Sequence, residues 1–350
     1  MLGRFAPSPT GPLHLGSLRT ALVAWLFARK ASSRFLVRIE DLDPQRSRRE
    51  WEQHQLRDLR ALGIDWDATP ARQSERFARY EAALSELERA GRLYPCFCTR
   101  AEIRAAASAP HGRAPTASAA PTGSVGPTGS VGPTASVAPT GSVAPTGSVA
   151  PTASAAAGAV PADGAGLPSD AYPGTCRSLS QAERARRLAA GERHALRVDA
   201  RAQRIGYEDA LLGAQSLCVD DFVVRRADGV PAYQLAVVVD DAAQGVEQVV
   251  RGADLADSTP RQILLARWLG LPVPAYAHVG LVLGPDGARL AKRHGAATLA
   301  DRDEPVSATL ALLAHSLGLA RDRERVTSAA ELLDEFDPAA LPRGPVTLGG

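Results

Sequence analysis

The sequence has little lysine, methionine or cysteine, and it has no long apolar run. Lysine occurs only at Lys30 and Lys292, so arginine supplies almost all of the positive charge. The formal net charge is only +2, which excludes a uniformly basic nucleic-acid-binding surface; any RNA contact is expected from local arginine clusters. A membrane-spanning helix needs about 18 or more apolar residues in a row, and the sequence has no such stretch.

The length of 350 residues indicates about two domains of ~150 residues each. No targeting segment precedes the first apolar residues, so we expect a cytoplasmic protein that does not associate with membranes. In a reducing compartment the four cysteines favour a metal site over disulfide bonds.

The first seventeen residues are the most informative stretch. Leu2–Ala6 is compatible with a short strand, the prolines and glycine of residues 7–12 exclude a helix, and Leu18–Ala31 reads as a helix. A strand, a tight loop and a helix N-terminus in this order direct backbone N–H groups and the positive helix end toward an anion. His14 lies where its ring can reach the same anion, although an ordinary surface turn is the alternative.

A carboxylate follows the next predicted strand, Phe35–Ile39. Glu40 comes directly after this strand, with Asp41 and Asp43 close behind. Ligands of open α/β sheets bind beyond the carboxyl ends of the strands, so an acid here can pair with an ammonium group or a ribose. For Asp41 and Asp43 the alternative is capping of the helix expected at 47–62.

Cysteines at two distant places could form one metal site. Cys96 and Cys98 lie on the same side of a predicted extended segment, and Cys176 follows Tyr172 by four residues. Three thiolates and a phenolate would complete the tetrahedral ligand set that zinc prefers. Purely structural cysteines are the alternative.

Between these two half-sites lies a repeat. Residues 121–156 contain six copies of a six-residue unit that begins with Pro-Thr and carries no charge and no aromatic side chain. Such units bury too little apolar surface to offset the entropy of the chain, so we expect disorder from about 105 to 169. A proline-rich segment that binds a partner is the alternative.

The second half of the chain contributes an arginine and a basic loop. The apolar run of Ala232–Asp241 predicts a buried strand, with Tyr233 near its start. Val246–Leu255 predicts another strand, which ends near Arg251. A buried arginine at a strand end needs either a ligand or a salt bridge. Lys292 lies in a basic, glycine-flanked loop, which is either a solvated turn or a mobile clamp for phosphates.

Two of these stretches resemble the motifs of class I aminoacyl-tRNA synthetases, in the form used by glutamyl-tRNA synthetases. One is similar to the HIGH region and comprises Pro7, Ser8, Pro9, Thr10, Gly11, Pro12, Leu13, His14, Leu15, Gly16 and Ser17. The other is similar to the KMSKS loop and comprises Arg289, Leu290, Ala291, Lys292 and Arg293. It departs at two positions, with Arg for the first Lys and Ala for the Ser.

The resemblance implies an α/β fold, with a Rossmann-like class I catalytic domain, an inserted zinc-binding module and a small C-terminal helical region. The two halves of the catalytic domain are expected at 1–95 and 180–258, and the zinc module at 96–179. Residues 259–350 would hold the KMSKS-like loop and the C-terminal helices, without an anticodon-binding domain.

The resemblance also implies site residues. Glutamate would be bound by Arg4, Phe5, Ala6, Pro7, Ser8, Glu40, Tyr233 and Arg251. In this set Glu40 receives the α-ammonium group, and Arg4 and Arg251 pair with carboxylate. ATP, with Mg²⁺, would be bound by His14, Gly16, Ser17 and Lys292, with His14 and Lys292 as the catalytic pair. One structural zinc ion would be held by Cys96, Cys98, Tyr172 and Cys176.

The short length and the C-x-C…Y-x-x-x-C pattern resemble the short paralogues of bacterial glutamyl-tRNA synthetase. These enzymes transfer glutamate to the queuosine base in the anticodon loop of tRNA(Asp). The resemblance therefore implies a monomer that activates L-glutamate with ATP without tRNA, and whose partner is queuosine-containing tRNA(Asp). The alternatives are a truncated glutamyl-tRNA synthetase that charges tRNA(Glu), and a non-catalytic binding module.

Overall fold

The computed structural model describes residues 1–99, 101–103, 171–284, 286–288, 290, 298–320 and 326–348. The disorder expected at 105–169 and most of the KMSKS-like loop lie outside these residues. Among the described helices, none is long and apolar enough to cross a bilayer.

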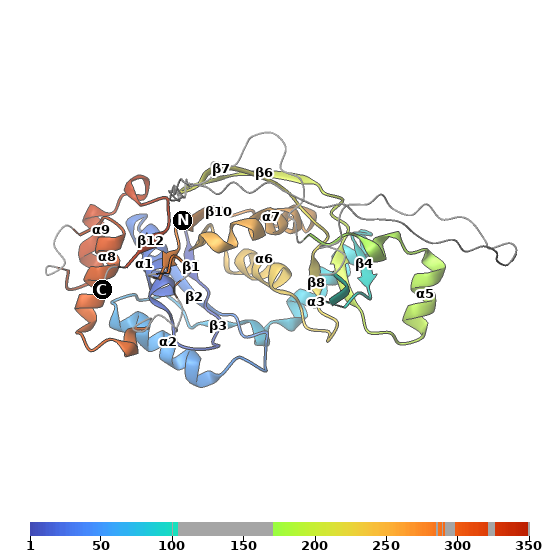
Figure 1. The fold of residues 1–350 in the computed structure, drawn as a ribbon, viewed down its shortest axis with the longest axis horizontal. Helices are drawn as coiled ribbons and strands as arrows, with labels where there is room; N and C mark the ends of the chain where they lie inside the picture. The colour runs from blue at the N-terminus through green and yellow to red at the C-terminus, as the bar shows by residue number, and fades with distance from the viewer. Residues whose placement is uncertain are drawn as a thin grey trace, which may run out of the picture. The chain divides into compact units, whose positions relative to one another are not determined.

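A seven-stranded sheet forms the centre of the described chain (Figure 1). Across the sheet the strands are β3 (Ala71–Arg72), β2 (Phe35–Ile39), β1 (Gly3–Phe5), β9 (Gln248–Gly252), β10 (Ala275–Val279), β6 (Arg204–Asp209) and β7 (Gly213–Cys218). All neighbours are parallel except β6 and β7, which form an antiparallel pair. The chain leaves β1 toward β2 on one side and returns to its other side as β9, so the ligand-binding switch point lies at β1 and β9.

Helices cover both faces of this sheet. One face packs on α1 (Leu15–Lys30), α2 (Arg49–Ala61), α8 (Val306–Ser316) and α9 (Leu332–Glu335). The other face packs on α3 (Phe77–Arg89), α6 (Tyr233–Gln244) and α7 (Thr259–Trp268). Successive residues of one strand pack into the cores on opposite faces of the sheet; Val250 packs on the α1 side and Val249 on the α6 side. Covered faces on both sides explain why the central strands are apolar throughout.

A smaller antiparallel sheet carries the cysteine segment. It contains β4 (Leu93–Cys96), β5 (Ala195–Val198) and β8 (Val223–Arg225). Helix α5 (Gln181–Ala189) precedes β5, and Ser180 is its N-cap: the Ser180 hydroxyl accepts a hydrogen bond from the Glu183 N–H at 3.2 Å. Because β5 pairs with β4 on one side and with β8 on the other, this sheet continues past the boundary expected at residue 180.

The strand predicted for Ala232–Asp241 is wrong, because these residues form most of α6. Leu235–Val239 is buried on every side, with α3 and α7 packed against the helix. A helix that is buried all round has the same continuous apolar sequence as a doubly covered strand, and a run of five residues cannot separate the two. Figure 1 shows α6 and α7 lying side by side.

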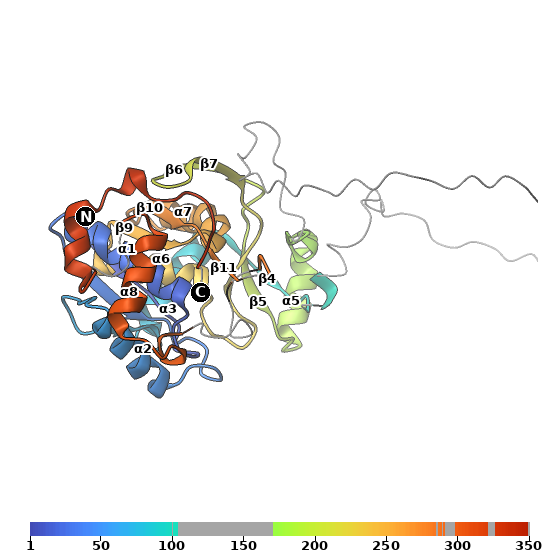
Figure 2. The same ribbon diagram turned by 60° about the vertical axis from the view of Figure 1, so that its left-hand side comes forward.

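The last described residues form a separate two-stranded sheet with a short strand that follows β10. In Figure 2, α8 is seen beside α1. Beyond it, β12 (Val346–Thr347) pairs in parallel with β11 (Val282–Leu283). The crossing is close, since a Cβ atom on Gly280 would lie 2.0 Å from the carbonyl oxygen of Gly344. Short 3-10 helices occupy Gln73–Glu75, Thr175–Ser178, Ala253–Ser258, Leu299–Asp301, Ala329–Glu331 and Pro338–Ala340.

Candidate active site

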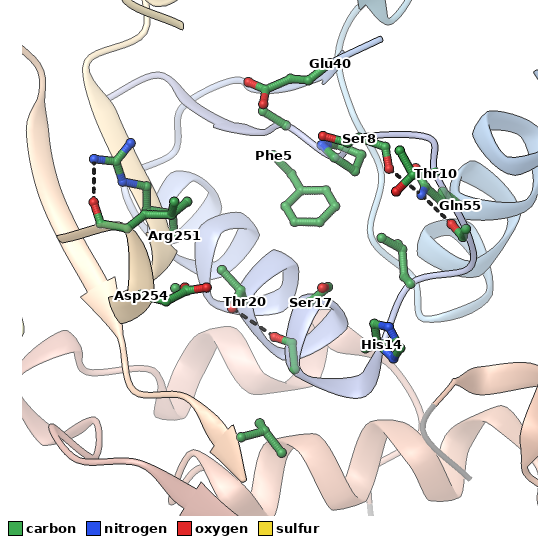
Figure 3. A pocket seen from close by; sticks show the side chains of 18 of the residues that line it. Phe5, Ser8, Thr10, His14, Ser17, Thr20, Glu40, Gln55, Arg251 and Asp254 are labelled. Atoms are coloured by element: carbon green, nitrogen blue, oxygen red, sulfur yellow. Dashed lines mark hydrogen bonds between the residues drawn. The ribbon is translucent and has the colours of Figure 1, made fainter. Parts of the chain in front are cut away.

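A cavity of about 710 Å³ opens at the carboxyl ends of β1 and β9, beside the N-terminus of α1 (Figure 3). Its lining includes every described residue that the sequence analysis assigned to glutamate or ATP: Arg4, Phe5, Ala6, Pro7, Ser8, His14, Gly16, Ser17, Glu40, Tyr233 and Arg251. Figure 3 shows Arg251 and His14 on opposite sides of the cavity, with Phe5 between them. The fold thus brings together residues from both halves of the chain.

The proline-rich loop after β1 is held in place by its neighbours. The side-chain amide of Gln55, on α2, donates hydrogen bonds to the carbonyl oxygens of Ser8 at 3.0 Å and Gly11 at 2.7 Å. Prolines have no N–H, so this loop relies on its carbonyl groups for hydrogen bonding. The sequence analysis missed Gln55, and no local pattern marks a residue that acts across 44 positions.

Helix α1 begins at Leu15, three residues earlier than predicted. His14 is its N-cap, and its carbonyl oxygen accepts from the backbone N–H groups of Ser17 and Leu18. The positive end of the helix therefore faces the cavity at Gly16 and Ser17, where it favours an anion.

One described residue of the KMSKS-like loop and one that follows it lie near this helix end. Leu290 lines the cavity, and Thr298 forms an isolated β-bridge with His14. Of the predicted motif Arg289–Arg293, only Leu290 is described. Lys292 lies outside the described residues.

The β1–β2 side of the cavity is a buried ion-pair network. Asp241, on α6, receives Arg4 Nε at 3.3 Å and Arg38 Nη1 at 2.5 Å. Arg38 also lies 3.2 Å from Glu40 and 3.9 Å from Asp240. Asp240 also pairs with Arg76 at 2.5 Å, so three arginines face three carboxylates and the charges balance locally.

Burial and these pairs act on the ionisation of the network. Burial alone lowers the pKa of Arg38, but the carboxylates of Asp241, Glu40 and Asp240 outweigh it and raise this pKa. For Asp241 burial again opposes the pairing, and Arg38 and Arg4 lower its pKa. Burial raises the pKa of Glu40, and Arg38 and Arg4 offset this only in part. Of the three groups, Glu40 is the one whose charged form the surroundings stabilise least.

The β9–β10 side has a different character. Arg251 is only 5% exposed. Its guanidinium donates to His278 Nε2 at 3.0 Å, to Gln262 Oε1 at 2.8 Å, to Thr259 Oγ1 at 2.7 Å and to the Leu255 carbonyl at 3.3 Å. Among the described residues no carboxylate contacts it, so the salt bridge considered as an alternative is absent there. A buried cation with neutral partners at a cavity wall favours an anionic ligand.

The two acids after Glu40 do not cap α2. The Asp41 carboxylate accepts from the backbone and the hydroxyl of Ser74, at 2.8 and 2.6 Å. Asp43 accepts from the Gln45 N–H within its own turn, at 3.1 Å. The capping alternative is therefore wrong. Asp43 holds a backbone group of its own turn, whereas Asp41 holds Ser74, 33 positions away.

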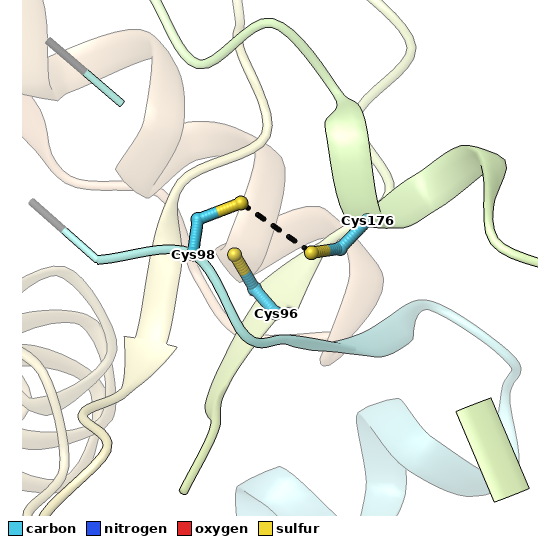
Figure 4. Close-up of side chains that lie close together, drawn as sticks. All are labelled: Cys96, Cys98 and Cys176. Atoms are coloured by element: carbon cyan, nitrogen blue, oxygen red, sulfur yellow. Dashed lines mark hydrogen bonds between the residues drawn. The ribbon is translucent and has the colours of Figure 1, made fainter. Parts of the chain in front are cut away.

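The three predicted cysteine ligands converge, although they come from segments 80 residues apart (Figure 4). Their sulfur atoms all lie within 4.8 Å of one another. The Tyr172 hydroxyl lies 3.4 Å from Cys96 Sγ and 3.5 Å from Cys98 Sγ. Burial raises the pKa of the Cys98 thiol to about 12, and a bound cation is what would stabilise the thiolate here.

Donors surround the cluster as they do in thiolate sites. Arg197 Nε lies 3.3 Å from Cys96 Sγ, and the Phe97 N–H lies 3.3 Å from Cys176 Sγ. The Arg197 guanidinium also covers the ring of Tyr172 at 3.9 Å. Three thiols and one phenol with such donors fit the chemistry of a structural zinc ion.

Comparison with known families identifies the fold and the enzyme class. Residues 1–123 and 163–344 match the family model described as tRNA synthetases class I (E and Q), catalytic domain. The chain belongs to this family. Its α/β fold is that of the class I catalytic domain, and it is a ligase-type enzyme of the family that uses ATP.

Individual relatives agree. The Glutamyl-Q tRNA(Asp) synthetase of Nocardia farcinica (strain IFM 10152) is 51% identical over 348 residues, which cover 98% of this chain and 91% of that protein. The one of Symbiobacterium thermophilum (strain DSM 24528 / JCM 14929 / IAM 14863 / T) is 44% identical, covering 99% and 96%. The fold is similar to the crystal structure of a glutamate tRNA ligase from Elizabethkingia meningosepticum CCUG26117, with a TM-score of 0.72 at 24% identity, covering 100% of this chain and 67% of that one.

Several residues that hold the cavity-lining side chains in place were not predicted from the sequence. Besides Gln55 these are Arg38, Asp241, Thr259, Gln262 and His278. Arg38 carried a signal, since a charge in the middle of an apolar strand requires a buried partner. The others become recognisable only when the sheet brings β9, β10 and α7 together.

Proposed function

We propose that this synthetase activates L-glutamate with ATP and transfers it to the queuosine base of tRNA(Asp). The main support is that one cavity is lined by Arg4, Glu40 and Arg251 and also by the N-terminus of α1. The two relatives named above carry the corresponding activity in their names and match almost the whole chain.

In this proposal Arg4 and Arg251 both bind the side-chain carboxylate of glutamate. Arg251 uses four of its N–H groups within the described chain and keeps one for a ligand. Arg4 uses two, on Asp241 and on the Val250 carbonyl, and keeps three. Arg4 can therefore form the paired hydrogen bonds that suit a carboxylate, and Arg251 adds one bond and its uncompensated charge.

Glu40 receives the α-ammonium group in this arrangement. It lies directly beyond β2, beside Tyr233 at the start of α6, and both line the cavity. Glutamine would offer a neutral amide where Arg251 needs a negative charge. A buried charge left without its partner disfavours such an analogue, and this is how glutamate would be selected.

His14 and the α1 N-terminus would hold the triphosphate across the cavity, and Mg²⁺ would accompany the phosphates. An oxygen of the glutamate α-carboxylate attacks the α-phosphorus. The bond from that phosphorus to the bridging oxygen breaks, giving glutamyl-AMP and pyrophosphate. The residues act by positioning the two anions and by stabilising the charge that develops. Lys292 would add a second cation to the phosphates.

Transfer follows in a second step. A hydroxyl of the queuosine base attacks the activated carbonyl carbon, and AMP leaves with the bonding electrons. The acceptor is supported by the names of the relatives and by their nearly full-length match.

The test separates activation from transfer. Glutamate-dependent exchange of labelled pyrophosphate into ATP, without tRNA, measures activation. Queuosine-containing tRNA(Asp), unmodified tRNA(Asp) and tRNA(Glu) are then offered with labelled glutamate. We expect exchange without tRNA and labelling of the first tRNA alone. Labelling of tRNA(Glu) would make the chain a conventional glutamyl-tRNA synthetase, and absence of exchange under all conditions would make it a non-catalytic module.

We also propose that Cys96, Cys98, Tyr172 and Cys176 hold one structural zinc ion. Metal analysis of the purified chain should give about one zinc per chain, and the Cys96→Ser/Cys98→Ser double variant should contain none. Cys218 lies outside the cluster, so Cys218→Ser is the matched control and should keep its zinc. A metal-free preparation with full exchange activity would reduce the cysteines to packing residues.

A further inference from the structure

Arg251 is oriented by a histidine that has no place in the proposed chemistry. His278, on β10, is fully buried, and its Nε2 atom lies 3.0 Å from Arg251 Nε. Its other ring nitrogen, Nδ1, lies 2.5 Å from Oδ2 of Asp209. Asp209 is the last residue of β6, so three adjacent strands each contribute one member of this line.

The partners determine the tautomer of His278. An arginine N–H can only donate, so Nε2 must accept and the ring proton must be on Nδ1. Nδ1–H then donates to Asp209. Thr259 agrees with this assignment: its oxygen accepts from Arg251 at 2.7 Å, which leaves its hydroxyl proton to donate to Nε2 at 3.2 Å.

Asp209 is itself fixed by the backbone. Its Oδ1 atom accepts from the N–H groups of Leu211 at 3.0 Å, Leu212 at 2.9 Å and His278 at 3.2 Å. Among the described residues no arginine or lysine pairs with it directly. The nearest cation along the line is Arg251, and the neutral imidazole connects the two charges.

We propose that Asp209 and His278 are positioning residues that hold Arg251 in the orientation that selects an acidic side chain. Asp209 keeps the proton on Nδ1, so Nε2 presents a lone pair to Arg251 Nε and fixes the plane of the guanidinium. The inference rests on the proposed function for its substrate, whereas the tautomer stands on the contacts alone.

The decisive variant is Asp209→Asn. An amide nitrogen in place of Oδ2 would donate to Nδ1, so the ring proton would move to Nε2 and oppose the Arg251 N–H. The same logic applies to the aspartate of a catalytic triad, where the amide stabilises the wrong tautomer. We expect the KM for glutamate in pyrophosphate exchange to rise at least about tenfold and the preference for glutamate over glutamine to fall. The KM for ATP should stay within about twofold.

Two further variants separate orientation from packing. His278→Gln can turn its amide oxygen to Arg251 and its amide nitrogen to Asp209, so it should keep most of the glutamate affinity. His278→Leu offers no acceptor and should lose it.

Imidazole ¹⁵N NMR of the folded chain gives a readout that does not depend on activity. The Nδ1–H tautomer is expected for His278 in the wild type and the Nε2–H tautomer in Asp209→Asn. A wild-type Nε2–H tautomer, or an unchanged glutamate KM after the tautomer has switched, would overturn the inference. If Asp209→Asn does not fold, equal glutamate KM values for His278→Gln and His278→Leu would overturn it. Failure of the wild type to exchange with glutamate would instead contradict the proposed function, and the NMR result would still decide the tautomer.

Discussion

The two sides of the cavity treat buried arginines in opposite ways. On the β1–β2 side, Arg38 is fully buried and surrounded by three carboxylates. On the β9–β10 side, Arg251 is almost as deeply buried, and its described partners are all neutral. The first arrangement is complete without a ligand. The second leaves a charge that a ligand can neutralise, so the partner set separates structural from ligand-binding arginines.

A third arginine limits this rule. Arg19, on α1, is 1% exposed, and within the described part of the chain it donates to Ser316 and to the carbonyl oxygen of Gly280 and to no carboxylate. Burial lowers its pKa to about 10. It does not line the cavity, and the carbonyl group of Ser316, the last residue of α8, faces it. Neutral partners therefore indicate a binding residue only when the guanidinium also faces a cavity.

The largest effect is expected on the balanced side. Arg38→Gln leaves the carboxylates of Asp241 and Glu40 buried without their main partner. We expect the free energy of unfolding to fall by about 3–5 kcal/mol, as it does when one member of a buried pair is removed. Urea titration followed by circular dichroism measures this loss.

The control for Arg38 is an exposed pair of the same type. Arg186 lies 2.7 Å from Glu183, on the surface of α5, and Arg186→Gln should change the unfolding free energy by less than about 1 kcal/mol. If the two variants lost similar amounts, the distinction between the two sides would have no basis in stability.

On the neutral side, the next effect should appear in binding. Arg251→Gln removes a cation whose partners can remain hydrogen-bonded in part, so we expect only about 1–2 kcal/mol of lost stability. The kcat/KM for glutamate in pyrophosphate exchange should fall about 10²–10³-fold, which corresponds to roughly 3–4 kcal/mol. Arg251→Lys keeps the positive charge but loses the forked geometry of the guanidinium. Its kcat/KM for glutamate should lie between those of the wild type and Arg251→Gln. A stability loss equal to that of Arg38→Gln, with unchanged kinetics, would assign Arg251 to the structural class.

Arg4 belongs to both sides and should give a mixed and smaller result. It pairs with Asp241, and it also reaches across to the Val250 carbonyl on β9. Because Arg38 still covers Asp241, Arg4→Gln should cost about 1–2 kcal/mol of stability. A fall of roughly 10- to 100-fold in kcat/KM for glutamate should accompany it. A change in only one of the two quantities would place Arg4 wholly on one side.

The sequence predicted the two sides unequally. Glu40 and Arg251 could be predicted from the sequence, because each is a charged residue at the end of an apolar strand. A charged residue is easily recognised next to an apolar run. Their supporting partners did not stand out. Asp241 lies in a segment predicted as a strand, and only its true helix turns it toward Arg4 and Arg38. His278 meets Arg251 through the parallel pairing of β9 and β10, and no property of either segment alone fixes that pairing.

The same reason separates the cysteine cluster from the cavity. Cys96 and Cys98, and Tyr172 and Cys176, are closely spaced within each pair and chemically distinctive, so their convergence across a long insertion could be predicted; the zinc ion stays a prediction. The neutral network around Arg251 consists of common residue types with no fixed spacing. Recognition from sequence was possible where the residue type is rare, and it failed where only the three-dimensional neighbours give the residue its role.

The smallest effect is a difference in how the two sides respond to acid. Burial lowers the pKa of His278, and Asp209 offsets this only in part. Below the unfolded value of about 6.5, the unfolded chain therefore takes up a proton that the folded chain resists, so stability falls as the pH drops from there toward the folded pKa. On the balanced side, the pKa of Asp241 is lowered, so its contribution is lost only below about pH 4.

Glu40 changes the free energy of unfolding with pH in the opposite direction to His278 and Asp241. Its pKa is raised, so its contribution to stability decreases as the pH rises above about 4.3. Comparison with His278→Gln isolates the histidine contribution, because glutamine does not titrate. Between pH 6.5 and 5.5, the wild type should lose up to about 1.4 kcal/mol per pH unit more than the variant. Parallel curves of unfolding free energy against pH would show that His278 does not resist protonation in the folded chain.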